Sequence, residues 1–194
     1  MPEVKVLIPG YAKQTEGENW KASATTSLVK AEDLNIIVDP GVNRELLLKK
    51  LEKENLKTKD VDFVMMTHTH PDHNYLSGIF ENAKALDDGL VYDEDKTYEH
   101  GGEVPGTELK IISTPGHNPF HASLVVPTEK GAVVVAGDVF WWKSDEEQEA
   151  SREELLSHQD PYVKDEEALQ ESRKKVLEIA DYIIPGHGEK FKVE

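Results

Sequence analysis

The sequence predicts an α/β (α+β) fold: a four-layer αβ/βα sandwich of two mixed sheets with helices on the outside. Strand-like segments come first and strands mixed with helices follow, an order that fits two packed sheets better than a doubly wound sheet. No Gly-x-Gly-x-x-Gly motif follows a strand, so a dinucleotide site is unsupported. Several strand-like segments end in a metal-ligand type of side chain, which is typical of a site at the carboxyl ends of strands.

Length and composition limit what this chain can be. Its 194 residues suffice for one domain with a substantial core, so residues 1–194 are predicted to form a single domain. The formal net charge of −16 makes a nucleic-acid partner or an anionic membrane unfavourable, although a bound metal reverses the charge locally. No apolar run reaches transmembrane length, and no cysteine offers a disulfide, a thiolate ligand or a nucleophile. The N-terminus does not resemble a signal peptide, so a cytoplasmic location is the default expectation.

The N-terminal half is predicted from short apolar runs separated by turn residues. Asn43 is in position to cap a helix, and Leu46, Leu47 and Leu51 give that helix an apolar stripe. The expected elements, in order, are a strand at 4–8, a polar loop at 11–25, a hairpin of strands at 27–30 and 35–38, a turn at 39–41, a helix at 44–54, a strand at 61–66 and a helix at 75–82.

The C-terminal half is predicted to hold short strands that are each followed by proline or glycine. Residues 87–107 are rich in acidic residues and glycine, which indicates loops with one short strand. Leu169, Val176 and Leu177 lie on one face of a second clear helix. The remaining expected elements are strands at 109–112, 122–126 and 132–135, a short helix near 152–157, a helix at 166–180 and a strand at 182–184.

A cluster of histidines follows the strand expected at 61–66. Residues 68–73 are His-Thr-His-Pro-Asp-His, so three histidines and one aspartate fall within six positions. Side chains of this kind at this density can hardly share a core, and they point to a bound metal. The donor set suits zinc or iron more than magnesium or calcium.

Three further segments repeat this arrangement of a strand followed by a ligand type of side chain. Ile111-Ile112-Ser113-Thr114-Pro115-Gly116 leads into one histidine, Val133-Val134-Val135-Ala136-Gly137 into an aspartate, and Ile183-Ile184-Pro185-Gly186 into another histidine. The glycine beside each ligand allows close approach of the backbone. Because strand ends converge in space, we expect one site. Its expected members are His68, His70, Asp72, His73, His117, Asp138 and His187.

These motifs, taken together and in this order, resemble the metallo-β-lactamase superfamily. The resemblance runs from the early strands and the Asp-Pro-Gly turn through His-x-His-x-Asp-His, Thr-Pro-Gly-His and Gly-Asp to the terminal Pro-Gly-His-Gly. It implies a metallo-β-lactamase-like fold and two divalent metal ions, zinc first, with iron or manganese as alternatives. One ion would be held by His68, His70 and His117, and the other by Asp72, His73 and His187, with Asp138 as a bridge between them.

The resemblance also implies a mechanism, in which a hydroxide between the two metals attacks the substrate. Two adjacent cations lower the pKa of a bound water toward neutrality, and the second cation polarises the scissile carbonyl or phosphoryl oxygen. Asp72 is expected to receive or relay the proton of the nucleophile. Asp39, in the Asp-Pro-Gly turn, is expected behind a ligand histidine, where a carboxylate fixes the tautomer; a plain helix-entry role is the alternative.

The residues that contact the substrate are less well defined. Trp141, Trp142 and Lys143 follow the expected bridging aspartate and could hold an apolar or planar group and an anionic group, although one tryptophan is expected in the core. Tyr11 lies on the first loop, which borders the active site in the family that this chain resembles. His121 is expected either to donate a hydrogen bond to substrate or to be an ordinary hydrogen-bonded histidine.

Differences between this sequence and the family that it resembles narrow the expected function. Asp138 stands where the common zinc β-lactamases have a thiolate, which argues against antibiotic hydrolysis. The chain ends seven residues after His187 and shows no helical domain of the glyoxalase II type, no inserted domain of the RNA-cleaving members and no flavin domain. A small-molecule pocket is therefore expected from loops 11–26, 87–106 and 141–165, or from a second subunit in a homodimer. A lid role for 141–165 is left unassigned, as are roles for His100 and His158.

Three functions remain open at this point. The first is hydrolysis of a small ester, thioester or lactone, which ranks highest because every ligand position of a two-metal site is filled. The second is a phosphodiesterase or ribonuclease of the same fold, which the net charge of −16 weakens. The third is a mononuclear iron sulfur (persulfide) dioxygenase, which would use only His68, His117 and Asp138.

Overall fold

The computed structural model describes residues 1–17 and 19–194. Its strands are β1 (Glu3–Ile8), β2 (Tyr11–Gln14), β3 (Trp20–Ser23), β4 (Thr26–Ala31), β5 (Leu34–Val38), β6 (Phe63–Met65), β7 (Lys84–Leu86), β8 (Leu90–Asp93), β9 (Lys96–Glu99), β10 (Lys110–Ser113), β11 (Ala122–Thr128), β12 (Gly131–Trp141), β13 (Tyr182–His187) and β14 (Phe191–Lys192). Its helices are α1 (Arg44–Lys53), α2 (Pro71–Asn74), α3 (Arg152–Ser157) and α4 (Glu166–Ile179), with 3-10 turns η1 (Thr58–Asp60) and η2 (Ser77–Ile79).

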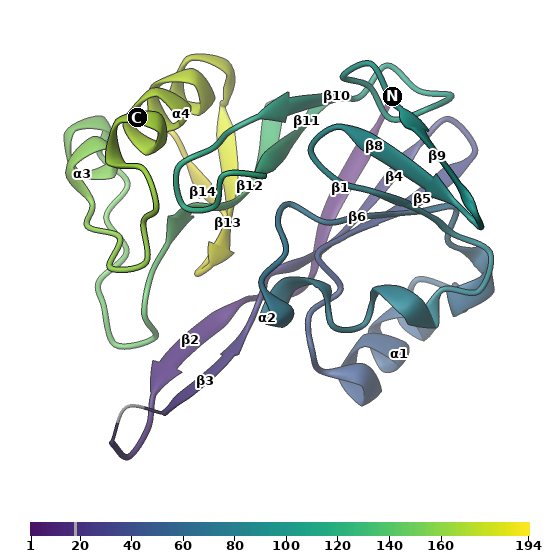
Figure 1. The fold of residues 1–194 in the computed structure, drawn as a ribbon, viewed down its shortest axis with the longest axis horizontal. Helices are drawn as coiled ribbons and strands as arrows, with labels where there is room; N and C mark the ends of the chain where they lie inside the picture. Colours follow the sequence, from purple (N-terminus) through teal and green to yellow (C-terminus); the bar gives the residue numbers. More distant parts are fainter. Residues whose placement is uncertain (18) are drawn as a thin grey trace.

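Two mixed sheets pack against each other, with helices on both outer sides (Figure 1). The first sheet has the strand order β1-β4-β5-β6-β7-β8-β9, and the second has the order β10-β11-β12-β13-β14. Helices α1 and α2 lie outside the first sheet, whereas α3 and α4 lie outside the second. The predicted αβ/βα sandwich class is confirmed.

Alternation of side chains along the strands produces three apolar layers. On β5, Ile36 and Val38 point into the core between the two sheets, while Ile37 points toward α1. On β12, Val133 belongs to the same central core and Val134 packs under α4. Successive side chains of a strand face opposite sides, so a run of apolar residues in sequence marks a strand that is buried on both faces.

Parallel pairs at the middle of each sheet bring the candidate ligands together. β5 and β6 run parallel in the first sheet, and β12 and β13 run parallel in the second. Parallel strands end at the same edge of a sheet. The histidine cluster follows β6, and the last predicted ligand ends β13, so both sheets present ligands where their strands end.

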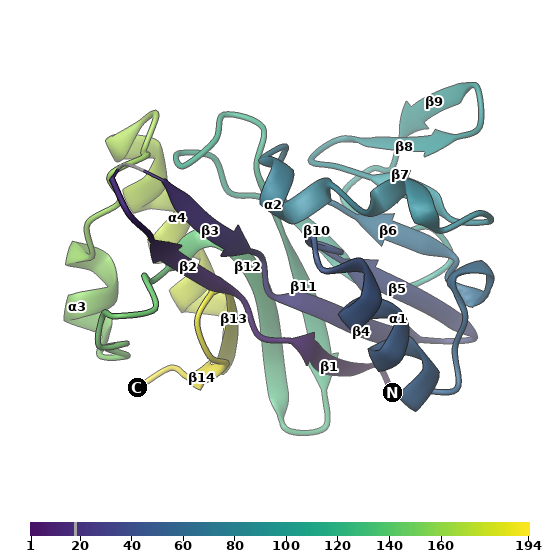
Figure 2. The same cartoon turned by 90° about the horizontal axis from the view of Figure 1, so that it is seen from below.

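The prediction of a loop over residues 11–25 is wrong, because β2 and β3 form a hairpin there. Tyr11 pairs with Ser23 and Gln14 pairs with Trp20. Figure 2 shows this hairpin crossing the lower face of the molecule toward α3 and α4. Its inward positions are mostly alanine, so the apolar alternation is too weak for the sequence pattern to reveal it.

The prediction of loops with one short strand over 87–107 is also wrong. β8 and β9 form a hairpin that extends the first sheet beyond β7. The strand β7 was itself not expected. Glu94 turns the chain between them with a φ of 55°, in the left-handed region, where glycine, asparagine and aspartate are the usual residues. The turn therefore carries no glycine signal.

The helix predicted over 75–82 is wrong, because this stretch forms the 3-10 turn η2 and no α-helix. The helix α2 starts earlier, at Pro71, because proline favours the first helical position, and it ends at Asn74. Gly78, a poor helix former, lies within the 3-10 turn η2 that follows. Among the described residues, no helix combines the length and the apolar character needed to cross a bilayer.

The strand predicted at 132–135 continues much further, to Trp141. The pairing register with β13 shifts on both sides of Gly137, whose φ is 53°. A glycine tolerates this left-handed backbone without a steric penalty, so the strand bends and then resumes. Asp138 therefore lies within β12 and not in a loop after it.

Candidate metal centre

All seven predicted ligands lie together between the two sheets' strand ends. They form two adjacent groups, and within each group one potential ligand atom per residue lies within 4.8 Å of the others. The first group is His68, His70, His117 and Asp138, and the second is Asp72, His73 and His187. The first group draws on the loop after β6, the loop after β10 and strand β12; the second draws on α2 and the end of β13.

The carboxylate of Asp138 lies between the two groups. Its Oδ2 is 3.2 Å from His117 Nε2 and 3.7 Å from His68 Nε2, both in the first group. Its Oδ1 is 3.1 Å from His73 Nε2 and 3.8 Å from His187 Nε2, both in the second group. One oxygen therefore faces each group, which is the geometry required of a bridging ligand.

The donor set fits divalent cations, because several of its atoms are buried and lack a hydrogen-bond partner. His68 Nε2, His73 Nε2 and Asp138 Oδ1 are buried without a hydrogen bond. An unpaired buried polar atom costs free energy, so native proteins rarely retain one without a role. Imidazole nitrogens and carboxylate oxygens are donors for zinc, iron and manganese, and a cation at the convergence of these atoms would satisfy them.

The opposite ring nitrogen of each buried histidine is fixed by a neighbour. Asp39 Oδ2 lies 2.8 Å from His73 Nδ1 and also accepts a hydrogen bond from Thr67 Oγ1 at 2.7 Å. Thr67 Oγ1 in turn lies 3.1 Å from His68 Nδ1. Asp39 thus holds His73 directly and His68 through one hydroxyl, and both rings direct Nε2 toward the centre, as ligand histidines do. The expected position of Asp39 behind a ligand histidine agrees with this geometry.

Two further supports were not expected from the sequence. Asp160 Oδ2 lies 2.6 Å from His117 Nδ1, and both residues are buried. The Nδ1 of His187 lies 3.1 Å from the carbonyl oxygen of Tyr11 and 3.2 Å from that of Ser23. Asp160 lies in an acidic segment whose composition indicates a solvated surface, so no local signal distinguishes it.

A glycine in the last motif makes room for the bridging carboxylate. A Cβ atom added to Gly186 would collide with Asp138 Oδ1. The backbone of β13 therefore approaches the carboxylate more closely than any side-chain-bearing residue would permit. This explains why the terminal motif needs glycine immediately before His187.

Mutual electrostatics tie the protonation states of these side chains together. Burial disfavours a charged His73, but the carboxylates of Asp138 and Asp39 outweigh it and raise the pKa of His73 well above its ordinary value. Burial likewise disfavours a charged Asp138, yet His73 and His187 hold the pKa of Asp138 well below its usual range. Burial, followed by repulsion from His73, lowers the pKa of His68 well below its ordinary value. The site thus holds buried carboxylates that require a nearby positive charge, which divalent cations would supply.

A cavity of about 450 Å³ opens onto this centre. Its lining combines five of the predicted ligands with apolar and aromatic residues from the β2–β3 hairpin, β12 and the segment between α3 and α4. The lining residues are Ala12, Trp20, Ala22, Val42, His70, Pro71, Asp72, His117, Asp138, Trp141, Tyr162 and His187. Trp20 and Tyr162 were not expected here.

Of the three predicted substrate residues after Asp138, only Trp141 lines the cavity. Trp142 packs in the core under α3 and α4, with its ring 5.7 Å from that of Phe191. Lys143 lies outside the cavity and pairs with Glu146 at 3.3 Å. Because β12 continues through Trp141, adjacent side chains face opposite ways, which sends one tryptophan to the cavity and the next to the core.

Tyr11 and His121 support the site and do not line the cavity. The Tyr11 hydroxyl accepts a hydrogen bond from Asn43 Nδ2 at 3.2 Å, so Asn43 stands at the N-cap of α1 without a side-chain capping bond. His121 is fully buried, stacks on His68 with ring centroids 5.1 Å apart and lies 2.9 Å from Thr114 Oγ1 through Nδ1. Burial lowers the pKa of His121 to about 3. Neither side chain lines the cavity, and the placement of His121 agrees with the alternative of an ordinary hydrogen-bonded histidine.

The two unassigned histidines lie away from the ligand cluster. His100 Nδ1 accepts a hydrogen bond from the backbone N–H of Gly102 in the turn after β9. His158 Nε2 lies 2.7 Å from the carbonyl oxygen of Trp141, and its ring packs on Trp142. Both have local structural partners.

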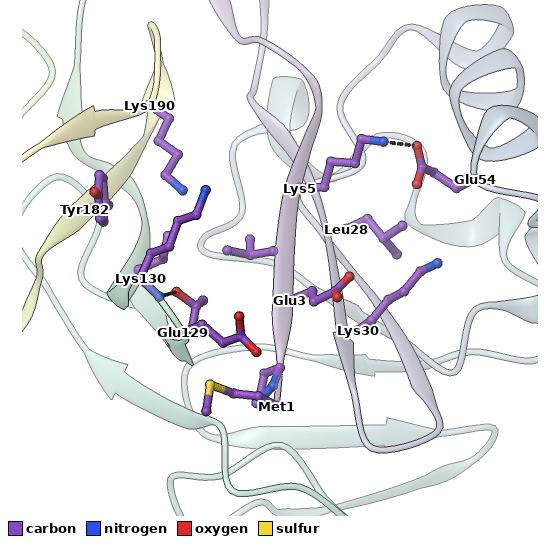
Figure 3. A pocket seen from close by; sticks show the side chains of 14 residues that line it. Met1, Glu3, Lys5, Leu28, Lys30, Glu54, Glu129, Lys130, Tyr182 and Lys190 are labelled. Atoms are coloured by element: carbon purple, nitrogen blue, oxygen red, sulfur yellow. Dashed lines mark hydrogen bonds and ion pairs between the residues drawn. The ribbon is translucent and has the colours of Figure 1, made fainter.

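A larger cavity, of about 730 Å³, lies between β1 and the start of β13 (Figure 3). Lys5 forms an ion pair with Glu54 there, and Lys190 Nζ lies 4.9 Å from the ring centroid of Tyr182. Neither histidine nor aspartate occurs among the described residues that line it. The candidate catalytic cavity is therefore the smaller one, where the metal donors converge.

Comparisons with known proteins identify the family and the fold. The sequence model of the Metallo-beta-lactamase superfamily matches residues 21–113. "Metallo-beta-lactamase domain-containing protein 1" of Xenopus laevis is 34% identical over 200 residues, which cover 98% of this chain and 81% of that protein. A protein of Methanocaldococcus jannaschii named as a probable metallo-hydrolase is 29% identical over 187 residues, covering 95% of this chain and 86% of the relative. Among solved structures, a candidate metallo-beta-lactamase from Thermotoga maritima superposes with a TM-score of 0.73 at 20% identity, over 98% of this chain and 99% of the other.

Proposed function

Because this chain belongs to the metallo-beta-lactamase superfamily, we propose that it is a hydrolase that holds two divalent cations and cleaves a small ester, thioester or lactone. The observation that carries this proposal is the pair of adjacent donor groups that share Asp138. A carboxylate with one oxygen toward each group is placed to be shared by a cation in each.

In this proposal, each cation has a defined set of ligands. His68, His70 and His117 would hold one, Asp72, His73 and His187 would hold the other, and Asp138 would be shared between them. Two such cations would supply a hydroxide nucleophile at neutral pH and would polarise the scissile carbonyl. We propose zinc for both positions because histidine, which supplies five of the seven donors, is a usual zinc ligand.

The chain's own residues would bind and orient the substrate and handle the proton. Asp72 lines the cavity, and although burial raises its pKa, the hydrogen bond and charge of His187 hold the pKa of Asp72 below its usual value. It is therefore ionised at neutral pH and can accept a proton from the attacking water. Asp39 and Asp160 keep His73 and His117 in the tautomer that directs Nε2 toward the centre.

A mononuclear iron enzyme is the principal alternative, and the second donor group argues against it. Such a site would use only His68, His117 and Asp138. The converging donor atoms of Asp72, His73 and His187 would then have no cation to coordinate. Metal content decides between the two functions.

The test is elemental analysis of protein purified without added metal, together with His187→Ala and the control His100→Ala. We expect about two zinc ions per chain in the wild type and in His100→Ala, and about one in His187→Ala, as for a two-metal site that loses one ligand. A single iron that is unchanged in His187→Ala would overturn the proposal. If two zinc ions are found, hydrolysis of phenyl esters, thioesters and lactones is assayed next with the zinc-loaded protein.

A further inference from the structure

Three aromatic side chains form a continuous wall from the rim of the cavity to the metal ligands. The rings of Trp20 and Tyr162 meet edge to face with centroids 6.0 Å apart, and those of Tyr162 and Trp141 lie 5.9 Å apart at 31°. Trp141 in turn lies 6.0 Å from the ring of His187. Trp20 and Tyr162 are 36% and 42% exposed, whereas Trp141 is 4% exposed. The wall thus runs from solvent to the catalytic centre.

The β2–β3 hairpin lines the cavity with the apolar residues Ala12, Ala22 and Trp20. Ala12 pairs with Ala22, and Trp20 lies two residues from Ala22 on the same face. The small alanines leave space beside the metal ligands, while Trp20 closes the outer end. The hairpin's cations, Lys13 and Lys21, pair across the strands on the opposite face and are exposed. The fold therefore directs the positive charge of this hairpin away from the cavity.

Away from the metal ligands, the described lining of the cavity supplies no cationic side chain for an anionic part of the substrate. Neither lysine nor arginine is among the described residues that line the cavity, and its charged members are the carboxylates Asp72 and Asp138. The nearby Lys143 pairs with Glu146 outside it. An anionic group placed against this wall would lose its hydration without gaining a partner, which is unfavourable. The lining thus disfavours a substrate that carries an anionic group against the aromatic wall, away from the metal ligands.

The aromatic wall is tied to the metal centre through one turn. Asp160 Oδ1 accepts a hydrogen bond from the backbone N–H of Tyr162 at 2.9 Å, while its Oδ2 lies 2.6 Å from His117 Nδ1. The residue that orients a metal ligand therefore also positions the middle ring of the wall. A substrate group held against Tyr162 is held at a fixed place relative to the metals.

We propose that this site takes an uncharged substrate with an apolar group next to the scissile carbonyl, and that Trp20 and Tyr162 select it by contact. This inference rests on the proposed hydrolase function and narrows its substrate class. A cavity of about 450 Å³ is within the range of small-molecule sites, so a group of several carbons fits beside the reacting carbonyl.

Binding of two uncharged ketones tests the wall without any reaction. Hexanophenone and acetophenone share the phenyl ketone and differ by four methylene groups. By calorimetry on the zinc-loaded protein, we expect hexanophenone to bind at least roughly tenfold more tightly, because each buried methylene favours binding. Trp20→Ala and Tyr162→Ala should each remove most of this difference, whereas Lys21→Ala, on the opposite face of the hairpin, should retain it. Equal affinities in the wild type, or a difference that survives both aromatic substitutions, would overturn the inference.

Two esters test the charge preference and separate the inference from the proposed function. Phenyl hexanoate and monophenyl adipate have the same scissile bond, and only the adipate carries a terminal carboxylate. We expect kcat/KM, which is insensitive to non-productive binding of that carboxylate to metal, to favour the hexanoate at least roughly tenfold. Hydrolysis of both esters at equal kcat/KM would overturn the inference and leave the hydrolase proposal intact. Tight, Trp20-dependent binding of hexanophenone without hydrolysis of any ester, thioester or lactone would support the wall and overturn the hydrolase.

Discussion

Asp39 and Asp160 perform the same task for two different metal ligands, but they do so from very different parts of the fold. Asp39 lies immediately after β5, is 1% exposed and binds His73, the backbone N–H of Thr67 and the Thr67 hydroxyl. Asp160 lies in the segment between α3 and α4, is 8% exposed and binds His117 and a backbone N–H. One carboxylate is built into a sheet, and the other depends on a connecting segment.

The difference lies in what else each carboxylate supports. Asp39 joins β5 to the loop after β6, so its bonds are part of the packing of the first sheet. The segment of Asp160 is joined to β12 by the buried Arg173 of α4, whose Nη1 donates to the carbonyl oxygen of His158 at 2.6 Å and whose Nε donates to that of Val139 at 3.1 Å. We therefore expect changes at Asp39 to affect stability and metal binding together, and changes near Asp160 to affect mainly metal binding.

The largest effect is expected for Asp39→Ala. The substitution leaves Thr67 N, Thr67 Oγ1 and His73 Nδ1 buried without their acceptor, and alanine is strained at a φ of 50°. We expect the free energy of unfolding to fall by about 3 kcal/mol or more, measured by urea denaturation in the presence of a chelator. Asp39→Asn, which tolerates this backbone, should lose less, and the exposed Asp33→Ala should change little. A stable Asp39→Ala protein would show that the sheet does not depend on this carboxylate.

A smaller and more selective effect is expected for Asp160→Ala. His117 then loses the partner of its Nδ1, so the first donor group should bind zinc roughly 10- to 100-fold more weakly. Competition with a chelator measures this in a His187→Ala background, in which the second group is already impaired. Glu147→Ala, an exposed acid of the same acidic stretch, is the matched control. Equal losses of unfolding free energy for Asp160→Ala and Asp39→Ala would remove the distinction between the two carboxylates.

The smallest effect is expected for Arg173→Met, which acts on His117 only through the segment of Asp160. Without the guanidinium, the carbonyl oxygens of that segment lose their donor, and zinc affinity of the first group should fall by about threefold to tenfold. In an Asp160→Ala background the same change should have little further effect. The exposed Lys174→Met provides the control. Additive losses in the double variant would mean that Arg173 acts by another route.

The part of the candidate site that is formed by residues close together in the sequence was predictable. His68, His70, Asp72 and His73 occupy one short segment after a strand, so their meeting requires only a local turn and one short helix. His117, Asp138 and His187 each follow or end an apolar run, and the strand-end rule brings such residues to one edge. Apolar runs such as those of β5 and β12 likewise indicated strands buried on both faces.

What the sequence did not reveal depends on contacts between distant segments. The hairpin of β2 and β3, the meeting of Trp20 with Tyr162, and the bond from Asp160 to His117 all join parts of the chain that have no local pattern in common. To predict which of Trp141 and Trp142 lines the cavity, one needs to know where β12 ends. The apolar pattern did not show this, because the strand bends at Gly137 and then continues.

The sequence by itself therefore indicated the candidate metal ligands and the layered sandwich, because residue spacing and side-chain periodicity act through backbone geometry over a few residues. Only the tertiary structure decided which residues orient those ligands and which ones line the cavity beside them. Those contacts depend on how strands far apart in the chain are ordered in the sheets, and no local preference of the backbone specifies that order.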